Sequence, residues 1–218
     1  MNEYKKKTMD IDVNYETKYF EFINNGLKDT LYDIKKTTTT KEDFFNELVS
    51  LTNITKKLNG RFFFIGNGAS AAFSNHMALD WSKNGGVYAT SLSDSSLLTA
   101  LSNDYSYEDA FVEFLQIEGV NENDIVITIS SSGNSENIVN VLKYCNTAKI
   151  KTIGFSGLKK DNKTRDLADF SLYVPKKTYG IVECIHQVFL HLWLDKSMDI
   201  YEWKREGVQN MNSKDFKL

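Results

Sequence analysis

The fold is decided by an apolar run that leads directly into a serine-rich loop: Asp124-Ile125-Val126-Ile127-Thr128-Ile129, then Ser130-Ser131-Ser132-Gly133-Asn134-Ser135. A run this short and this apolar is typical of a strand covered on both faces of a parallel sheet. A helical pattern of apolar residues follows at 138–142. In such sheets ligands bind beyond the carboxyl ends of the strands, where loops lead into helix N-termini. The serine-rich loop therefore occupies a position typical of a ligand site.

Four other short runs have the apolar composition typical of buried strands: Arg61–Ile65, Val87–Ser91, Lys151–Phe155 and Phe170–Val174. Helical patterns separate them, and a last long helix is predicted over Gly180–Trp193. Strands that alternate with helices predict an α/β fold of the doubly wound type. We expect a three-layer sandwich in which a parallel five-stranded sheet is flanked by helices.

The first 59 residues are predicted to be helical. Apolar residues recur at helical spacing from Tyr19 to Ile34 and again from Phe44 to Ile54, with a break at Thr37–Thr40. This N-terminal helical pair is either a dimerisation arm or a layer packed on its own domain. The expected organisation is a helical arm at 1–59, a core domain at 60–196 and a C-terminal tail at 197–218, which is either an extra interface or a loose end.

Composition narrows the function classes. The chain has 218 residues, 41% hydrophobic and 25% charged, which suits one globular domain. Its net charge of −3 does not favour nucleic acid as a partner. The N-terminus lacks the apolar region of a secretory signal and no run is long enough to span a membrane, so a cytoplasmic protein is expected. The two cysteines, Cys145 and Cys184, are expected to be buried and reduced.

The serine-rich loop has the chemistry of an anion site. Unpaired N–H groups at a helix start attract an anion, and short hydroxyl side chains complete its hydrogen-bonding shell. Gly133 lets the backbone approach closely. The alternative is an ordinary turn between a strand and a helix, with Ser135 as the N-cap.

A second loop, Gly66-Asn67-Gly68-Ala69-Ser70, follows the first predicted strand. It has no lysine in the P-loop position and does not fit the GxGxxG pattern, so no nucleotide cofactor is expected. Both loops end parallel strands and should face one crevice, which favours a small anionic ligand.

These two loops, with Asp94–Leu98 and Ser102–Tyr105 between them, resemble the SIS-domain phosphoheptose isomerases in order and spacing. The resemblance covers roughly residues 60 to 195 and implies the flavodoxin-like SIS fold, with the serine-rich loop as a phosphate cradle. It implies the isomerisation of sedoheptulose 7-phosphate to D-glycero-D-manno-heptose 7-phosphate, for the heptose of lipopolysaccharide or capsule. The substrate contacts that it implies are Asn67, Gly68, Ser70, Asp94, Asn103, Asp104, Ser130, Ser131, Ser132, Asn134 and Ser135.

Candidate acid–base groups lie on the two helices expected to flank the crevice. His76 and Asp80 are four residues apart and share one helix face. Glu183 and His191 are eight residues apart, about 80° around the helix, with Gln187 between them. From spacing alone, a helix-surface pair and an interface histidine with a satisfied hydrogen bond explain these residues better than a catalytic site does.

The resemblance implies a zinc site built from a His and a Glu four apart and a Gln and a His eight apart. The matching positions are His76, Asp80, Glu183 and His191, so Asp replaces Glu and Glu replaces Gln. Two hypotheses remain open. Either Glu183 and His191 are the acid–base pair and Asp80 helps to hold a metal or the sugar, or Asp80 is the base and Glu183 strengthens the binding of Zn²⁺ or another divalent cation.

Three functions stay open at this stage. The first is the heptose phosphate isomerase, and the second is an isomerase of another ketose or amino-sugar phosphate. The third is a non-catalytic phosphosugar sensor, although residues 1–59 lack the basic face of a DNA-binding helix-turn-helix. The resemblance also implies a homodimer or homotetramer with active sites between subunits.

Overall fold

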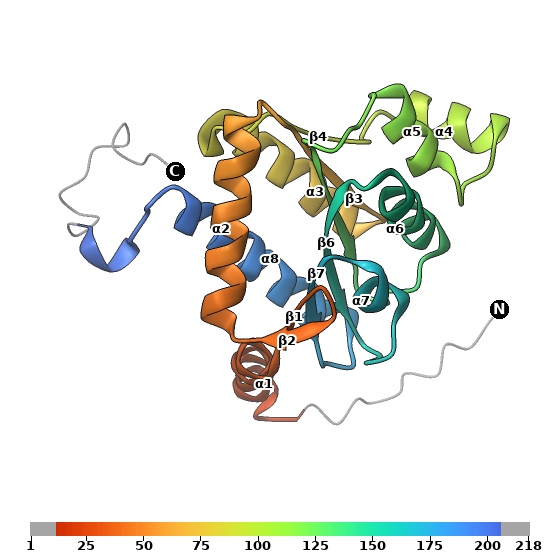
Figure 1. Cartoon of the computed structure of the whole chain (residues 1–218). Coiled ribbons are helices and arrows are strands. Elements are labelled where there is room, and N and C mark those ends of the chain that lie inside the picture. The colour runs from red at the N-terminus through yellow and green to blue at the C-terminus, as the bar shows by residue number, and fades with distance from the viewer. Residues whose placement is uncertain (1–11, 206–218) are drawn as a thin grey trace, which may run out of the picture.

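The computed structural model describes residues 12–205, which form one sheet between two layers of helices (Figure 1). The five predicted strands are all present and parallel, in the order β4-β3-β5-β6-β7. The predicted α/β class and the parallel five-stranded sheet are therefore confirmed. Their bounds are Phe62–Gly66 for β3, Ala89–Ser91 for β4, Ile125–Ser130 for β5, Lys151–Gly157 for β6 and Phe170–Val174 for β7.

The sheet has two further strands that the helical interpretation of the N-terminus missed. β1 (Leu31–Ile34) and β2 (Thr37–Thr39) form an antiparallel hairpin, and β1 pairs antiparallel with β7. Leu31 and Ile34, assigned above to a helix, are therefore strand residues, and that assignment was wrong. Only α1 (Tyr15–Asp29) and α2 (Lys41–Lys57), on either side of the hairpin, are helical as predicted.

The hairpin has a local and a tertiary cause. β-branched residues at 37–39 favour strands over helices. Lys35 and Lys36 both have positive φ, as a two-residue type I′ turn requires. The free edge of β7 then supplies the hydrogen-bonding partners for β1. Apolar spacing alone could not distinguish this arrangement from a longer helix.

The two helical layers bury opposite faces of the sheet. Phe62 and Phe64 of β3 pack in one apolar cluster, and Phe63 and Ile65 pack in the other, because successive side chains of a strand point to opposite faces. The first cluster is covered by α2, α3 (Ala69–Asp80) and α8 (Tyr179–Ser197), and the second by α4 (Ser95–Asp104), α5 (Ala110–Ile117), α6 (Glu136–Ala148) and α7 (Lys163–Leu167).

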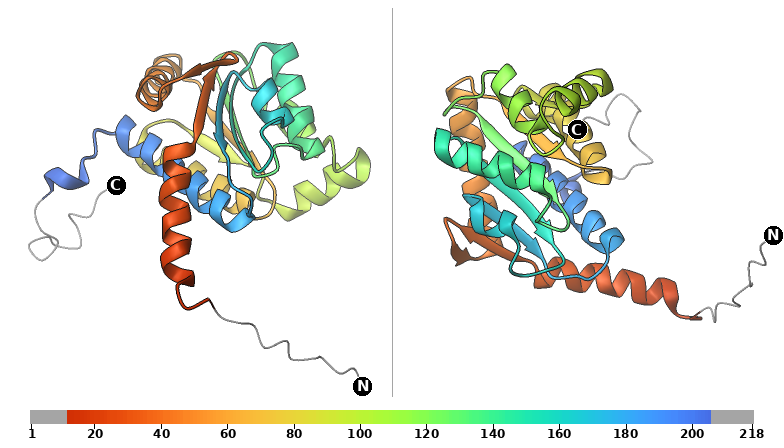
Figure 2. Two further views of the ribbon diagram at one scale, coloured as in Figure 1. Left: turned by 90° about the horizontal axis from the view of Figure 1, so that it is seen from below. Right: turned by 90° about the vertical axis from the view of Figure 1, so that its right-hand side faces the viewer.

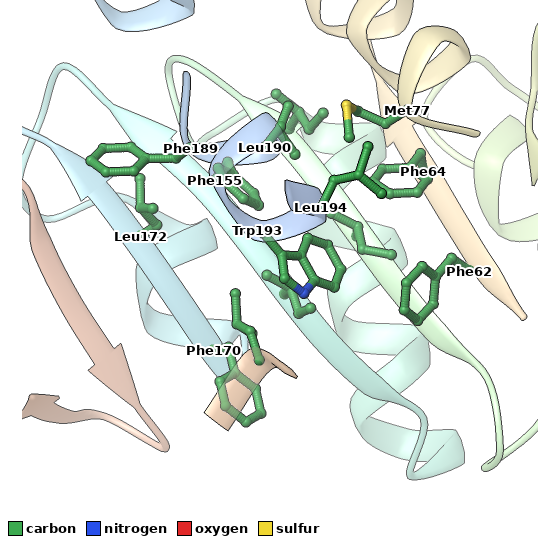
Figure 3. Packing of buried hydrophobic residues seen from close by; sticks show 14 of the residues in the cluster. Phe62, Phe64, Met77, Phe155, Phe170, Leu172, Phe189, Leu190, Trp193 and Leu194 are labelled. Carbon is green, nitrogen blue, oxygen red and sulfur yellow. The ribbon is translucent and has the colours of Figure 1, made fainter. Parts of the chain in front are cut away.

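Trp193 of α8 lies at the centre of the first cluster (Figure 3). Its ring is fully buried, with its centroid 5.3 Å from that of Phe62 and 4.8 Å from that of Trp81. Its Nε1–H donates to the hydroxyl of Thr52 on α2 at 3.0 Å. A buried tryptophan with a satisfied N–H fixes both position and rotation. Trp193 therefore holds α8, which carries two of the candidate site residues, against α2 and the sheet.

The N-terminal helix α1 packs on its own domain while much of its length stays exposed. Tyr19, Ile23 and Leu27 pack against the first cluster, whereas Phe20 and Phe22 are 68% and 57% exposed. Figure 2 shows α1 extending from the body of the molecule. After α8, a short 3₁₀ turn (Glu202–Lys204) is present, and residues 206–218 of the predicted tail lie outside the described residues.

The two cysteines lie in different environments. Cys145 is buried and has a free thiol, as predicted, but Cys184 is exposed on α8, so its predicted burial was wrong. Helical spacing placed Cys184 correctly on a helix and did not reveal which face it occupies. Among residues 12–205, no helix is both long and apolar enough to cross a membrane.

His186 of α8 is the fully buried histidine of the core. Its Nε2 lies 3.0 Å from the carbonyl oxygen of Ser156 at the end of β6. Burial lowers the pKa of His186 to about 4, against the opposing effect of that hydrogen bond. The folded state therefore holds this histidine neutral, and its N–H links α8 to β6.

We expect the His186 ring to make unfolding pH-dependent. The contribution of neutral His186 to the free energy of unfolding is fully present above about pH 6.5, the pKa of histidine in the unfolded chain. This contribution is lost as the pH falls toward 4, because in that range only the unfolded chain binds the proton. The loss between pH 7 and pH 5.5 should be about 1 kcal/mol, measured by urea unfolding. His186→Leu should remove this part of the pH dependence; an unchanged pH profile in that variant would contradict the assignment.

Candidate functional site

The two loops singled out in the sequence meet at one edge of the sheet. β3 and β5 are neighbours, with Gly66 in register with Ile129, so both strands end at the same level. A pocket of about 320 Å³ lies between the loops, within the range of small-ligand sites. Its lining residues are Asn67, Gly68, Ala69, Ser70, Ile129, Ser130, Ser131, Ser132, Ser135, Tyr179 and Glu183.

The serine-rich loop depends on glycine at position 133. Gly133 has φ of +64°, and a Cβ there would lie 2.2 Å from Oδ1 of Asn162. The Asn162 side chain cannot retreat freely, because it caps α7 by accepting from the N–H of Arg165 at 2.9 Å. A side chain at 133 would be strained both by its φ and by this contact. The loop and the start of α7 thus fix each other.

The hydroxyl groups of this loop do not make the hydrogen bond of an ordinary capping turn, although the Oγ of Ser132 accepts from the N–H of Asn134 at 3.2 Å. Ser135 is the N-cap residue of α6, yet its side chain does not cap the helix, and its Oγ lies 3.4 Å from that of Ser130. The Oγ of Ser131 is buried and has no hydrogen-bond partner among the described residues. An ordinary capping turn would use the serine hydroxyl at the N-cap. The arrangement favours the anion-site interpretation, in which a ligand supplies the missing partners.

The first loop forms the opposite wall. Gly68 has φ of +55° and is the N-cap residue of α3, so no side chain caps this helix either. Asn67 is tied to residues that the sequence reasoning did not select. It exchanges hydrogen bonds with Asn137 of α6 and accepts one from the Tyr107 hydroxyl. No motif signalled these partners, because the contacts join segments 40 and 70 residues apart.

Four of the predicted substrate contacts do not line the pocket. Asp94 is exposed and caps α4, accepting from the N–H of Leu97 at 2.8 Å. Asn103 and Asp104 are exposed at the end of α4 and bond to each other at 2.9 Å. Asn134 is also exposed, and its Oδ1 accepts from the N–H of Lys163. The structure of one chain thus gives these side chains local roles.

A second group of site residues lies farther along α3 and α8. Ligand atoms of His76, Asp80 and His191 all lie within 4.8 Å of one another. Nε2 of His76 is 3.3 Å from Oδ2 of Asp80, and the rings of His76 and His191 are 5.2 Å apart between centroids. Glu183 does not belong to this cluster and lines the pocket instead. The four residues matched by spacing are therefore divided between two neighbouring places.

The His76–Asp80–His191 cluster fits a divalent transition metal. Asp80 is only 4% exposed, and its Oδ2 makes no well-aligned hydrogen bond to the described residues, although Nε2 of His76 lies 3.3 Å away. An orphaned buried carboxylate oxygen beside two imidazoles is the donor set that zinc prefers, and three protein ligands leave one position open. Asp195, one turn after His191, is a neighbour that spacing did not select. Burial raises its pKa, against the opposing effect of His191.

Known proteins share both the sequence pattern and the fold. The family model of the SIS domain matches residues 27–157, which contain both loops. A phosphoheptose isomerase of Helicobacter pylori strain P12 is 31% identical over 168 residues, spanning 74% of this chain and 86% of that protein. The chain belongs to the SIS-domain family of phosphoheptose isomerases. Another relative, the phosphoheptose isomerase of Thermodesulfovibrio yellowstonii, is 32% identical over 73% of this chain and 85% of its own length.

The SIS fold extends over nearly the whole described chain. The phosphoheptose isomerase structure from Neisseria gonorrhoeae superposes with a TM-score of 0.73, covering 85% of this chain and 96% of that one, at 22% identity. The flavodoxin-like SIS architecture that the resemblance implies is thus confirmed. The hairpin β1–β2 lies inside the family match, which begins at residue 27.

We expect the affinity for Zn²⁺ to depend on the His76–Asp80–His191 cluster and not on Glu183. His191→Ala should weaken Zn²⁺ binding roughly 100-fold or more, since even partners in the outer shell of a metal site are worth ~10–100-fold. Glu183→Gln, a change of nearly equal size, should leave the affinity within about threefold, because Glu183 lies outside the cluster. Isothermal titration calorimetry with Zn²⁺ measures both variants. Equal losses in the two would place Glu183 among the ligands.

Proposed function

We propose that the protein is an aldose–ketose isomerase that converts sedoheptulose 7-phosphate to D-glycero-D-manno-heptose 7-phosphate, supplying heptose for lipopolysaccharide or capsule. The observation that carries this proposal is the pocket in which the serine-rich loop and Glu183 face the same space. Relatives named phosphoheptose isomerase align with this chain over most of their own length. A phosphate cradle and a carboxylate in one cavity suit a reaction that moves protons on a tethered sugar.

The phosphate would be held without a cationic side chain. The described lining of the pocket contains no lysine or arginine, and its charged member is Glu183. The hydroxyls of Ser130, Ser131, Ser132 and Ser135 and the N-termini of α3 and α6 provide donors and a favourable dipole instead. Of the predicted contacts, Asn67, Gly68 and Ser70 complete this wall.

Proton transfer then needs a base at carbon and an acid at oxygen. In the proposed cycle, Glu183 removes a proton from C1 of the ketose, and His191 moves the proton from O1 to O2 through the enediol. The protonated Glu183 returns a proton to C2, which leaves the aldose and restores both residues. If a divalent cation is bound, His76, Asp80 and His191 would hold it and it would polarise the carbonyl and hydroxyl oxygens of the substrate, so that the proton passes between these oxygens without His191.

The position of Glu183 favours the first of the two acid–base hypotheses. Asp80 is 4% exposed and lies among the histidines, whereas Glu183 is half-buried and open to the pocket. A base must come within hydrogen-bond reach of the carbon-bound proton. We therefore assign the base to Glu183 and a metal-holding role to Asp80.

Association of copies is part of the proposal. Apolar side chains are exposed on α1 and on α8, the helix that begins at the pocket: Tyr15, Phe20, Phe22, Tyr179 and Val188. Such surfaces on neighbouring helices are typical of interfaces. A homodimer or homotetramer with sites between subunits would cover them, and it offers Asp94, Asn103 and Asp104 a route to a substrate bound in another copy. The proposed place of action is the cytoplasm.

The decisive experiment follows a panel of ketose and amino-sugar phosphates by NMR in D₂O, with and without Zn²⁺. We expect sedoheptulose 7-phosphate to be turned over, with deuterium entering at C2 of the aldose. Turnover of a different member would redirect the substrate assignment. Binding of phosphosugars without any turnover would favour the sensor function instead.

Matched variants test the assignment of the base. Glu183→Gln keeps the shape of the side chain and removes the base, so kcat should fall ~10²–10⁴-fold. His191→Ala should lower kcat as well, since it removes the acid of the metal-free cycle and a ligand of the metal-bound protein. Full turnover by Glu183→Gln, together with inactivity of His191→Ala, would return the base to Asp80.

A further inference from the structure

Asn67 lines the pocket, and its side-chain amide forms hydrogen bonds with two other segments: α6 and the connection between α4 and α5. Its Nδ2 donates to Oδ1 of Asn137 at 2.9 Å, and Nδ2 of Asn137 donates back to Oδ1 of Asn67 at 3.1 Å. The hydroxyl of Tyr107 donates to the same Oδ1 of Asn67 at 2.8 Å. Three hydrogen bonds therefore fix the plane of this amide.

The two partners are themselves held in place. Asn137 is in the first turn of α6 and is 3% exposed. Tyr107 lies between α4 and α5, and its ring packs beside that of Phe111, with 6.5 Å between centroids. Asn140 of α6 ties the same connection down by donating to Oδ1 of Asp109 at 3.0 Å. The network thus joins the loop after β3, the helix after β5 and the α4–α5 connection.

We propose that Tyr107 and Asn137 are positioning residues of the active site, which act by aiming the Asn67 amide at the substrate. The amide of Asn67 has two N–H donors, and Asn137 uses one of them. The other has no acceptor among the described residues, and Asn67 borders the pocket. Because its carbonyl oxygen is fully engaged, this donor is what the side chain offers to a phosphate or sugar oxygen.

The physical effect is preorganisation. A free asparagine side chain can flip its amide and present oxygen instead of N–H, which would repel an anionic ligand. The reciprocal pair opposes that flip, because Oδ1 of Asn137 also accepts from the backbone N–H of Ile138 at 3.0 Å, which holds Asn137 in one orientation. The bond from Tyr107 adds to this before the ligand arrives. Binding then does not have to order the side chain, which lowers its cost.

The test uses Tyr107→Phe, which removes one hydroxyl from a half-exposed side chain, with Tyr105→Phe on the same connection as the matched control. We expect Tyr107→Phe to raise both KM and the Kd for inorganic phosphate roughly 5-fold, as loss of one hydrogen bond would, with kcat within twofold. Tyr105→Phe should leave all three unchanged, and urea midpoints of both should match the parent. Unchanged KM and phosphate Kd in Tyr107→Phe would overturn the proposal.

A double-variant cycle with Asn137→Ala checks that both residues act through Asn67. Once Asn137 is absent the amide is already free to turn, so the combined loss should be smaller than the product of the single losses. If the losses of affinity in the two single variants simply multiply in the double variant, the proposal that both residues act through Asn67 would be wrong. If Asn137→Ala fails to fold, Tyr107→Phe alone still decides.

This inference rests on the proposed function only where it uses KM. If the parent protein turns over none of the sugar phosphates, the proposed function fails. The phosphate Kd of Tyr107→Phe then still tests the positioning role.

Discussion

The pairing of β3 with β5 is the constraint on which the site depends. Because the two strands are parallel and in register from Phe62 to Gly66, their carboxyl ends reach the same edge of the sheet. Each end runs into a loop that opens a helix, so two helix N-termini border one small space. Neither loop could make an anion site of this shape alone. A slip of one residue would also exchange the two buried faces of β3.

Helix α8 positions two of the candidate site residues relative to the pocket. The helix begins at the pocket, runs under the sheet and is fixed by Trp193 and His186 in the core. Glu183 and His191 sit on this one rigid element, at two places eight residues apart. α3 starts at the same pocket with Ser70 and delivers His76 and Asp80 to the same depth as His191. Glu183 and the His76–Asp80–His191 cluster are thus separated along two helices that both begin at the pocket.

Sequence reasoning predicted the parts of this design that are local. The buried strands that end at Ile65 and Ile129 were visible as apolar runs, and the loops that follow them were visible by composition. It failed where tertiary pairing overrides spacing, as at Leu31–Ile34, whose periodicity fits a helix until the edge of β7 is present. The grouping of His76 and Asp80 could be predicted from their separation of four residues. That His191 joins them and Glu183 does not depends on how α8 packs, which spacing cannot specify. Tyr107 and Asn137 carried no signal, since their role depends on contacts between distant segments.

The two ends of the sheet have a consequence for how copies of the molecule can meet. The outermost strands, β2 and β4, have three residues each, and the longer strands all lie between them. A sheet grows across a molecular boundary by adding backbone hydrogen bonds to an open edge, and three residues offer few. The threonines of β2 also expose polar side chains there. Continuous sheets between copies are thus disfavoured. Any interface between copies would therefore be formed by side chains of the helices.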